Sequence, residues 1–306
     1  MTDTFTLDEV LNGENFIITD GVNVQGRWYE RAVYPAGSFA KLNQEVLTML
    51  VEQELPAALN WVSSPKIHFV QRGVDELQRF AGIISHKLSS LNDYEKGSNK
   101  SRTKSKRIKI NGPERVNGKI LMENLNLMYN NLLKVAKRSI YVPENEELFR
   151  TISNLVDVVA DNSNAIKDYS MRHRYQDVSS RKAENLHADE QIVATAIYRS
   201  VIGEPTAIVS GDSDIGRLLY HTVRLVTNLE MPNNAQFYDL FNQNPVFTYF
   251  IIHSGMLEPH FNTDSLKKFK RFAIEDINEP RLVRTKQRLE ELSREILSLA
   301  TVTATQ

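Results

Sequence analysis

Residues 206–215 read TAIVSGDSDI, a short apolar run that ends in two acids. The first five residues, Thr206 to Ser210, are apolar or β-prone, which predicts a buried strand. Gly211 predicts a turn, which contains Asp212 and Asp214. The segment that follows, GRLLYHTV, has helical character. The stretch therefore predicts a strand, a turn and a helix, which is the basic unit of an α/β fold.

Two further stretches place acids in related positions. NFIITDGVNV (residues 15–24) predicts a buried strand from Phe16 to Thr19 that ends at Asp20. HADEQIVATAIYRSV (residues 187–201) predicts an amphipathic helix with Asp189 in its first turn, directly before the strand at Thr206.

The rest of the chain also alternates between strands and helices, which predicts an α/β domain with a mainly parallel sheet flanked by helices. Strands are expected at residues 66–70, at VRLVT (223–227) and at VFTYFII (246–252). Helices are expected at residues 37–59 with a break at Pro56, from Gly73 onward, at 118–138, at 143–167 and from Pro280 to the C-terminal region.

The predicted C-terminal helix carries an apolar seam, for which two interpretations stay open. The helix can pack onto its own domain, or it can form a homodimer contact. The seam consists of Leu282, Leu289, Leu292, Ile296 and Leu299.

The acids are expected to converge because the carboxyl ends of parallel strands meet at one edge of a sheet. Crowded carboxylates repel one another unless a cation lies between them, and oxygen ligands suit Mg²⁺ or Mn²⁺. Such a metal can polarise a phosphate. Each acid also has a plain structural alternative: Asp20 can form a turn with Gly21, Asp189 can favour the helix dipole, and Asp214 can cap a helix.

Three motifs resemble those of PIN-like nucleases, most closely the NYN branch. IITDGVNV resembles the first acidic motif, HADEQIVATA the acidic helix and TAIVSGDSDI the last acidic motif, in the same order. The resemblance implies a Rossmann-like PIN core in which Asp20, Asp189, Asp212 and Asp214 hold the metal and Asn23 orients Asp20. It implies metal-dependent cleavage of nucleic acid, with RNA favoured over DNA. Some family members are inactive, so a catalytically inactive nucleic-acid-binding or regulatory protein is the alternative.

The chain departs from the compact family core, because 169 positions (189 minus 20) separate Asp20 from Asp189. We therefore expect the first part of the core at residues 1–92, a basic loop and helical insertion at 93–180, the second part of the core at 181–260 and a C-terminal helical extension at 261–306. Asp75, Glu76 and Glu190 are candidates for a further metal ligand. On a helix, Glu190 would point about 100° away from Asp189.

Residues 96–119 contain nine Lys or Arg and one acid, Glu114. The segment is either a solvated loop or a nucleic-acid contact, and beside a nuclease-like core we favour contact with phosphates. Arg27 could contact phosphate and Trp28 could stack on a base, although ordinary packing explains Trp28 equally well. The six candidate phosphate contacts in the basic segment are Lys100, Arg102, Lys104, Lys106, Arg107 and Lys109.

Composition narrows the classes of function. The chain has no cysteine, which excludes disulfides and thiolate chemistry, and a net charge of −1, which excludes a polybasic chain. No signal peptide or membrane span is expected, so we predict a soluble cytoplasmic protein. Neither GxGxxG nor a Walker lysine motif occurs. A haloacid dehalogenase-type phosphatase needs an acid two residues after Asp20, where Val22 stands.

Overall fold

Strand β4 (Thr206–Ser210) lies inside a six-stranded sheet whose order is β1-β6-β5-β4-β2-β3. The computed structural model describes residues 5–19, 55–79, 81–82, 85–86, 118–161, 188–227, 233–253, 256–263 and 280–303. The other strands are β1 (Phe5–Thr6), β2 (Ile17–Thr19), β3 (Ile67–His68), β5 (Val246–His253) and β6 (Met256–Pro259).

Four neighbouring strands, β3, β2, β4 and β5, run parallel, whereas β6 and β1 add an antiparallel edge. The predicted α/β class with a mainly parallel sheet is therefore confirmed. Strand β2 pairs with β4 so that Ile17 lies opposite Ala207 and Thr19 opposite Val209. These residues are buried, as parallel strands covered by helices on both faces require.

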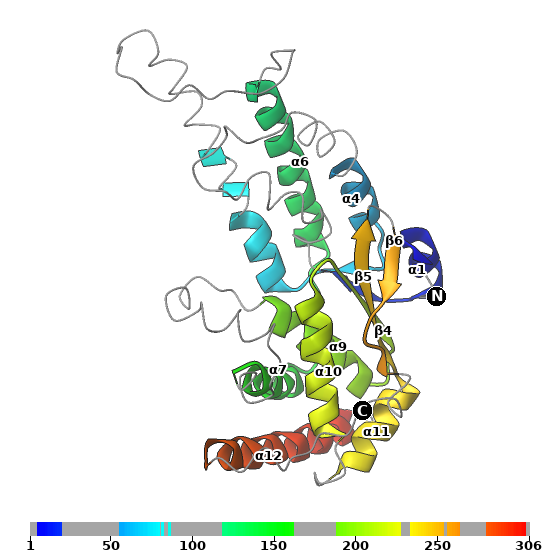
Figure 1. Ribbon diagram of the computed structural model, residues 1–306, viewed down its shortest axis with the longest axis vertical. Helices are drawn as coiled ribbons and strands as arrows, with labels where there is room; N and C mark the ends of the chain where they lie inside the picture. The colour runs from blue at the N-terminus through cyan, green and yellow to red at the C-terminus, as the bar shows by residue number, and fades with distance from the viewer. Residues whose placement is uncertain are drawn as a thin grey trace, which may run out of the picture.

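Helices cover both faces of the sheet. Because successive side chains of a strand point to opposite faces, neighbouring residues of one strand fall into two different hydrophobic clusters. Ile18 and Ile208 belong to one hydrophobic cluster, and Ile17, Ala207 and Val209 belong to the other. In Figure 1, α4 and α6 lie above the level of α7 and α12. The first cluster contains residues of α7 (Glu146–Asp161), α9 (Ala188–Val201), α10 (Ser213–Val226), α11 (Asn234–Gln243) and α12 (Pro280–Thr303). The second contains residues of α1 (Leu7–Gly13), α4 (Leu55–Val62), helical residues 71–79 and α6 (Gly118–Arg138).

The strand predicted at residues 223–227 is wrong, because α10 continues through Val226. The apolar run VRLV is the last turn of an amphipathic helix rather than a separate element. The buried residues of this helix recur at three- and four-residue spacings, which is the helical period: they include Ile215, Leu218, Leu219, Val223 and Val226.

The break predicted at Pro56 stays a prediction, because residues 37–54 of the expected helix lie outside the described residues. Helix α4 is described from Leu55, with Pro56 as its second residue, and runs on to Val62.

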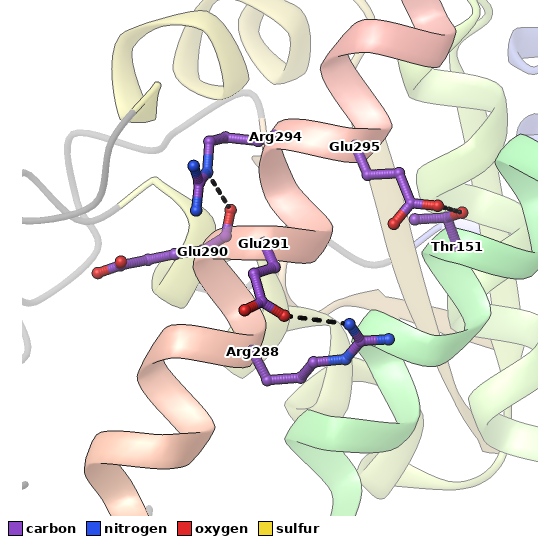
Figure 2. Close-up of polar contacts among 6 residues, drawn as sticks. All are labelled: Thr151, Arg288, Glu290, Glu291, Arg294 and Glu295. Atoms are coloured by element: carbon purple, nitrogen blue, oxygen red, sulfur yellow. Dashed lines mark hydrogen bonds and ion pairs between the residues drawn. The ribbon is translucent and has the colours of Figure 1, made fainter.

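From Leu289 onward, the apolar seam of α12 packs against α7, so its packing onto the chain's own domain is confirmed. Leu289, Leu292 and Ile296 are buried there. The Thr151 hydroxyl of α7 donates a 3.0 Å hydrogen bond to the Glu295 carboxylate of α12, drawn as a dashed line in Figure 2. On the exposed side, Arg288 and Glu291 form an ion pair of 3.2 Å. A homodimer through this helix stays a prediction.

Within the described ranges, no helix has the length and the apolar character that crossing a bilayer demands.

Candidate functional site

The ends of β2 and β4 lie side by side at the carboxyl edge of the sheet, meaning the edge at which the parallel strands end. Thr19, the last residue of β2, pairs with Val209, and its buried hydroxyl donates a 3.1 Å hydrogen bond to the Val209 carbonyl oxygen. Asp20 directly follows Thr19 in the chain, although it lies outside the described residues. The adjacency predicted for the two acid-bearing strands is therefore present.

Asp212 is held by two short hydrogen bonds in the turn after β4. Its backbone N–H donates to the Ser210 hydroxyl at 2.9 Å. Its carboxylate Oδ1 accepts from the backbone N–H of Asp214, also at 2.9 Å, so Asp212 is the N-cap of α10. The capping role that the sequence suggested for Asp214 therefore belongs to Asp212. A carboxylate has two oxygens with about four acceptor positions, so capping leaves room for another ligand.

Helix α9 runs antiparallel to β4, and this direction places its first turn at the carboxyl edge. Near the end of the helix, Arg199 Nε donates to the hydroxyl of Thr206, the first residue of β4, at 3.1 Å. The Arg199 guanidinium also lies 3.5 Å from the ring centroid of Phe16, just before β2. Ten residues separate Asp189 from Arg199, about 15 Å of helix, and β4 spans about 13 Å. Asp189 therefore lies level with the strand ends.

A second contact, near the start of α9, supports this placement. The backbone N–H of Arg72, at the start of the helical segment after β3, donates to Gln191 Oε1 at 2.9 Å. The start of that segment lies just beyond the end of a parallel strand, so Gln191 must also lie near the carboxyl edge. Gln191 is two residues from Asp189.

Both acids in the first turn of α9 are buried: Asp189 is 6% exposed and Glu190 is 3% exposed. Burial of a carboxylate is costly unless hydrogen bonds, opposite charge or a metal compensate it. Burial therefore does not favour Asp189 over Glu190 as a ligand. Asp75 and Glu76 lie farther along the helical segment that begins near Gln191, and Asp75 accepts a 2.8 Å hydrogen bond from Gln71.

The described acids do not form a complete metal centre by themselves. In the described part of the chain, no group of three or more histidine, aspartate or glutamate side chains is arranged to hold a metal ion. The predicted centre also requires Asp20, which is not among these residues. The donors that are described, on Asp189, Asp212 and Asp214, are carboxylate oxygens, the chemistry that fits Mg²⁺ or Mn²⁺.

The remaining predicted site residues lie outside the described residues. They are Asn23, Arg27, Trp28 and the six basic residues Lys100, Arg102, Lys104, Lys106, Arg107 and Lys109.

Three residues that the sequence analysis did not single out position this edge: Thr19, Ser210 and Gln191. Ser210 is a hydroxyl residue that closes an apolar strand just before an acidic turn. Such residues commonly bond to nearby backbone groups, as Ser210 does to the Asp212 N–H, so its position was a usable signal. Thr19 and Gln191 carried no comparable signal, because their partners lie 190 and 119 residues away.

Comparison of the chain with models of known protein families, with curated proteins and with solved structures finds no match. The interpretation of the site therefore depends on the motifs and on the geometry of the carboxyl edge.

Proposed function

We propose that this chain is a metal-dependent nuclease with a PIN-like core, which hydrolyses phosphodiester bonds in RNA or DNA, with RNA favoured. One observation carries the proposal: β2 and β4 are parallel neighbours, and each leads into an acidic motif at the same edge. The first turn of α9, with Asp189, lies at that edge as well. A metal site built from all three motifs would require this arrangement.

In this proposal Asp20, Asp189, Asp212 and Asp214 hold Mg²⁺ or Mn²⁺, and Asn23 orients Asp20. The metal would supply charge stabilisation at a phosphate and an activated water. Residues of the chain itself would hold the proposed metal ligands in position. The Thr19 hydroxyl ties the two strand ends together, and the Ser210 hydroxyl and the Asp214 N–H hold the turn at Asp212.

The substrate would be captured outside the acidic edge. We propose that the basic residues between Lys100 and Lys109, together with Arg27, contact phosphates and that Trp28 contacts a base. Contacts of this kind give affinity that depends on salt and not on sequence.

One observation favours a second function. Asp212 caps α10, which is a structural role that needs no metal. An inactive PIN-like protein that binds nucleic acid or regulates a partner could keep this aspartate for that reason alone.

A cleavage assay separates the two functions. Labelled single- and double-stranded RNA and DNA are incubated with the chain in Mg²⁺, in Mn²⁺ and in EDTA. We expect cleavage only with a divalent ion, and its loss in Asp189→Asn. The control is Asp239→Asn, which changes an exposed aspartate of α11. Undiminished cleavage by Asp189→Asn would reject the assigned acids, and no cleavage under any condition would favour the inactive protein.

A further inference from the structure

Four aromatic side chains form a row beside α10. Phe250 of β5 lies 6.3 Å from His260, His260 lies 4.1 Å from Phe261, and Phe261 lies 4.9 Å from Tyr220 of α10, measured between ring centroids. His260 is exposed and the other three are partly exposed. We call these residues the aromatic row.

The aromatic row is not part of the hydrophobic core. Neither of the two hydrophobic clusters that cover the sheet includes any of its rings. Rings that serve only as core are normally enclosed by aliphatic side chains. A row of rings at the surface instead leaves faces or edges accessible to a planar ligand.

Gly216 brings the row close to the acidic edge. A Cβ atom at this position would collide with the His260 ring and would lie 3.2 Å from Phe261 Cδ2, so only glycine allows both rings to contact the helix here. Gly216 is four residues beyond the N-cap Asp212, about 6 Å along the helix axis. His260 is therefore roughly one helical turn from the acidic turn.

The backbone that carries His260 and Phe261 is firmly held. His260 N–H donates to the Thr248 carbonyl oxygen at 2.8 Å, and Phe261 N–H donates to the Thr248 hydroxyl at 2.7 Å. Beyond the rings, Asn262 accepts from Thr248 N–H and Thr263 accepts from the backbone N–H of Val246, both at 2.7 Å. The rings are thus presented by a preorganised segment, which reduces the entropic cost of binding.

Positive charge accompanies the row. Arg217 and Arg224 lie three residues before and four residues after Tyr220, positions that share one face of an α-helix. Arg224 donates to the Tyr220 hydroxyl at 3.3 Å, and its guanidinium lies 5.5 Å from the Tyr220 ring centroid. Aromatic rings interleaved with cations are the composition of a groove that binds single-stranded nucleic acid.

We propose that the aromatic row is a base-stacking site for a single-stranded segment of nucleic acid, whose phosphates contact Arg217 and Arg224. The site deepens the proposed nuclease function and rests on it, since the bound strand would continue toward the turn at Asp212. Stacking on rings is independent of the sugar, so RNA and DNA strands both bind. A duplex, whose bases are already stacked, does not.

The test measures binding without cleavage. Fluorescence anisotropy in EDTA compares oligouridylate, oligothymidylate and an abasic strand of equal length, each of about twelve nucleotides. His260→Ala should weaken binding of both base-bearing strands by about five- to tenfold, the lower end of the range for one base–aromatic stack. Binding of the abasic strand should not change. The matched control, His86→Ala, removes an exposed histidine elsewhere and should alter neither.

A second variant guards against a merely structural effect. His260→Phe keeps a flat ring on the same backbone and should retain tight binding of the base-bearing strands, although it removes the imidazole. An equal loss for base-bearing and abasic strands in His260→Ala, no loss at all, or a preference of the wild-type chain for duplex would each overturn the stacking site.

The result is also distinguishable from failure of the nuclease. Base-dependent binding without cleavage in Mg²⁺ or Mn²⁺ would keep the row and reject the nuclease. Cleavage by the wild type, together with unchanged strand binding in His260→Ala, would support the nuclease and reject the aromatic row as a stacking site.

Discussion

Substitutions at Asp212 separate its capping role from its proposed role as a metal ligand. Asp212→Ala removes the acceptor of the 2.9 Å bond from the Asp214 N–H and should lower the free energy of unfolding by about 1 kcal/mol. Asparagine and serine are good N-caps, so Asp212→Asn and Asp212→Ser should keep that bond. For a chain of this size, 1 kcal/mol corresponds to a fall in Tm of about 2 °C.

Removal of the charge has two further effects in Asp212→Asn. It forfeits an interaction with the dipole of α10 of up to about 1 kcal/mol. It also relieves repulsion from the other carboxylates at the carboxyl edge in the metal-free chain. The two effects oppose each other, so the Tm of Asp212→Asn in EDTA should equal or slightly exceed that of the wild type.

The assay is thermal unfolding in EDTA and in Mn²⁺, paired with cleavage of a labelled single strand. A metal present at one hundred times its Kd stabilises the folded chain by about 2.7 kcal/mol. The wild type should show that rise, and all three variants should lose most of it together with cleavage. Only Asp212→Ala should lose stability in EDTA.

Two results would refute this reasoning. If Asp212→Asn keeps both the Mn²⁺-induced rise and full cleavage, Asp212 is only a helix cap. If Asp212→Ala is as stable as Asp212→Asn in EDTA, the hydrogen bond to the Asp214 N–H contributes nothing to the stability of α10.

Three further predictions address other parts of the chain. Thr19→Val should cost about 1 kcal/mol and lower kcat, because its hydroxyl ties the acid-bearing strand ends together; Thr222→Val, which loses a hydroxyl bond within α10, should leave kcat unchanged. Burial, and to a smaller extent the Arg199 guanidinium, lower the pKa of His68 below its ordinary value of 6.5. The unfolded chain therefore binds this proton more tightly than the folded chain, and the free energy of unfolding should fall as the pH drops below about 6.5. Denaturant titrations at pH 7 and pH 5 measure this fall in the free energy of unfolding. It should be smaller in His68→Gln than in the wild type, and the same as in the wild type in the control His86→Gln. Leu292→Ala, in the interface between α12 and α7, should cost about 2–5 kcal/mol in the same titrations, and a loss below about 1 kcal/mol would contradict that packing.

Local pattern was sufficient for most of the elements. Strand β4 and helix α6 have the bounds expected from the sequence, because side-chain periodicity and flanking turn residues act within a few positions. The same local signal failed at residues 223–227, where four residues of VRLVT complete α10. A short apolar run satisfies both a strand and the buried side of a helix, and only its neighbours in space decide between them.

The helices between the two parts of the predicted core illustrate a limit of another kind. Their apolar spacing predicted helices, and the break in the family pattern suggested an insertion. In the structure, α7 contributes to the cluster around Ile208, and α6 contributes to the cluster around Val209. Amphipathic spacing indicates that a helix buries one face, but it does not identify the element against which that face packs.

The acidic positions illustrate what sequence alone determines about this protein. A strand that ends in Asp-Gly or Gly-Asp carries its carboxylate at a strand end wherever the strand is placed, so the candidate residues are a local property. Which strands become neighbours is not local. Thr19 and Val209 are 190 residues apart, and only the tertiary structure makes them partners. The same holds for Gly216, which reads as an ordinary helical glycine until His260, brought in by the strand pairing of β5 and β6, occupies the space where a Cβ would be. Periodicity is recorded along the chain, whereas contact is decided by how distant segments bury their apolar faces together.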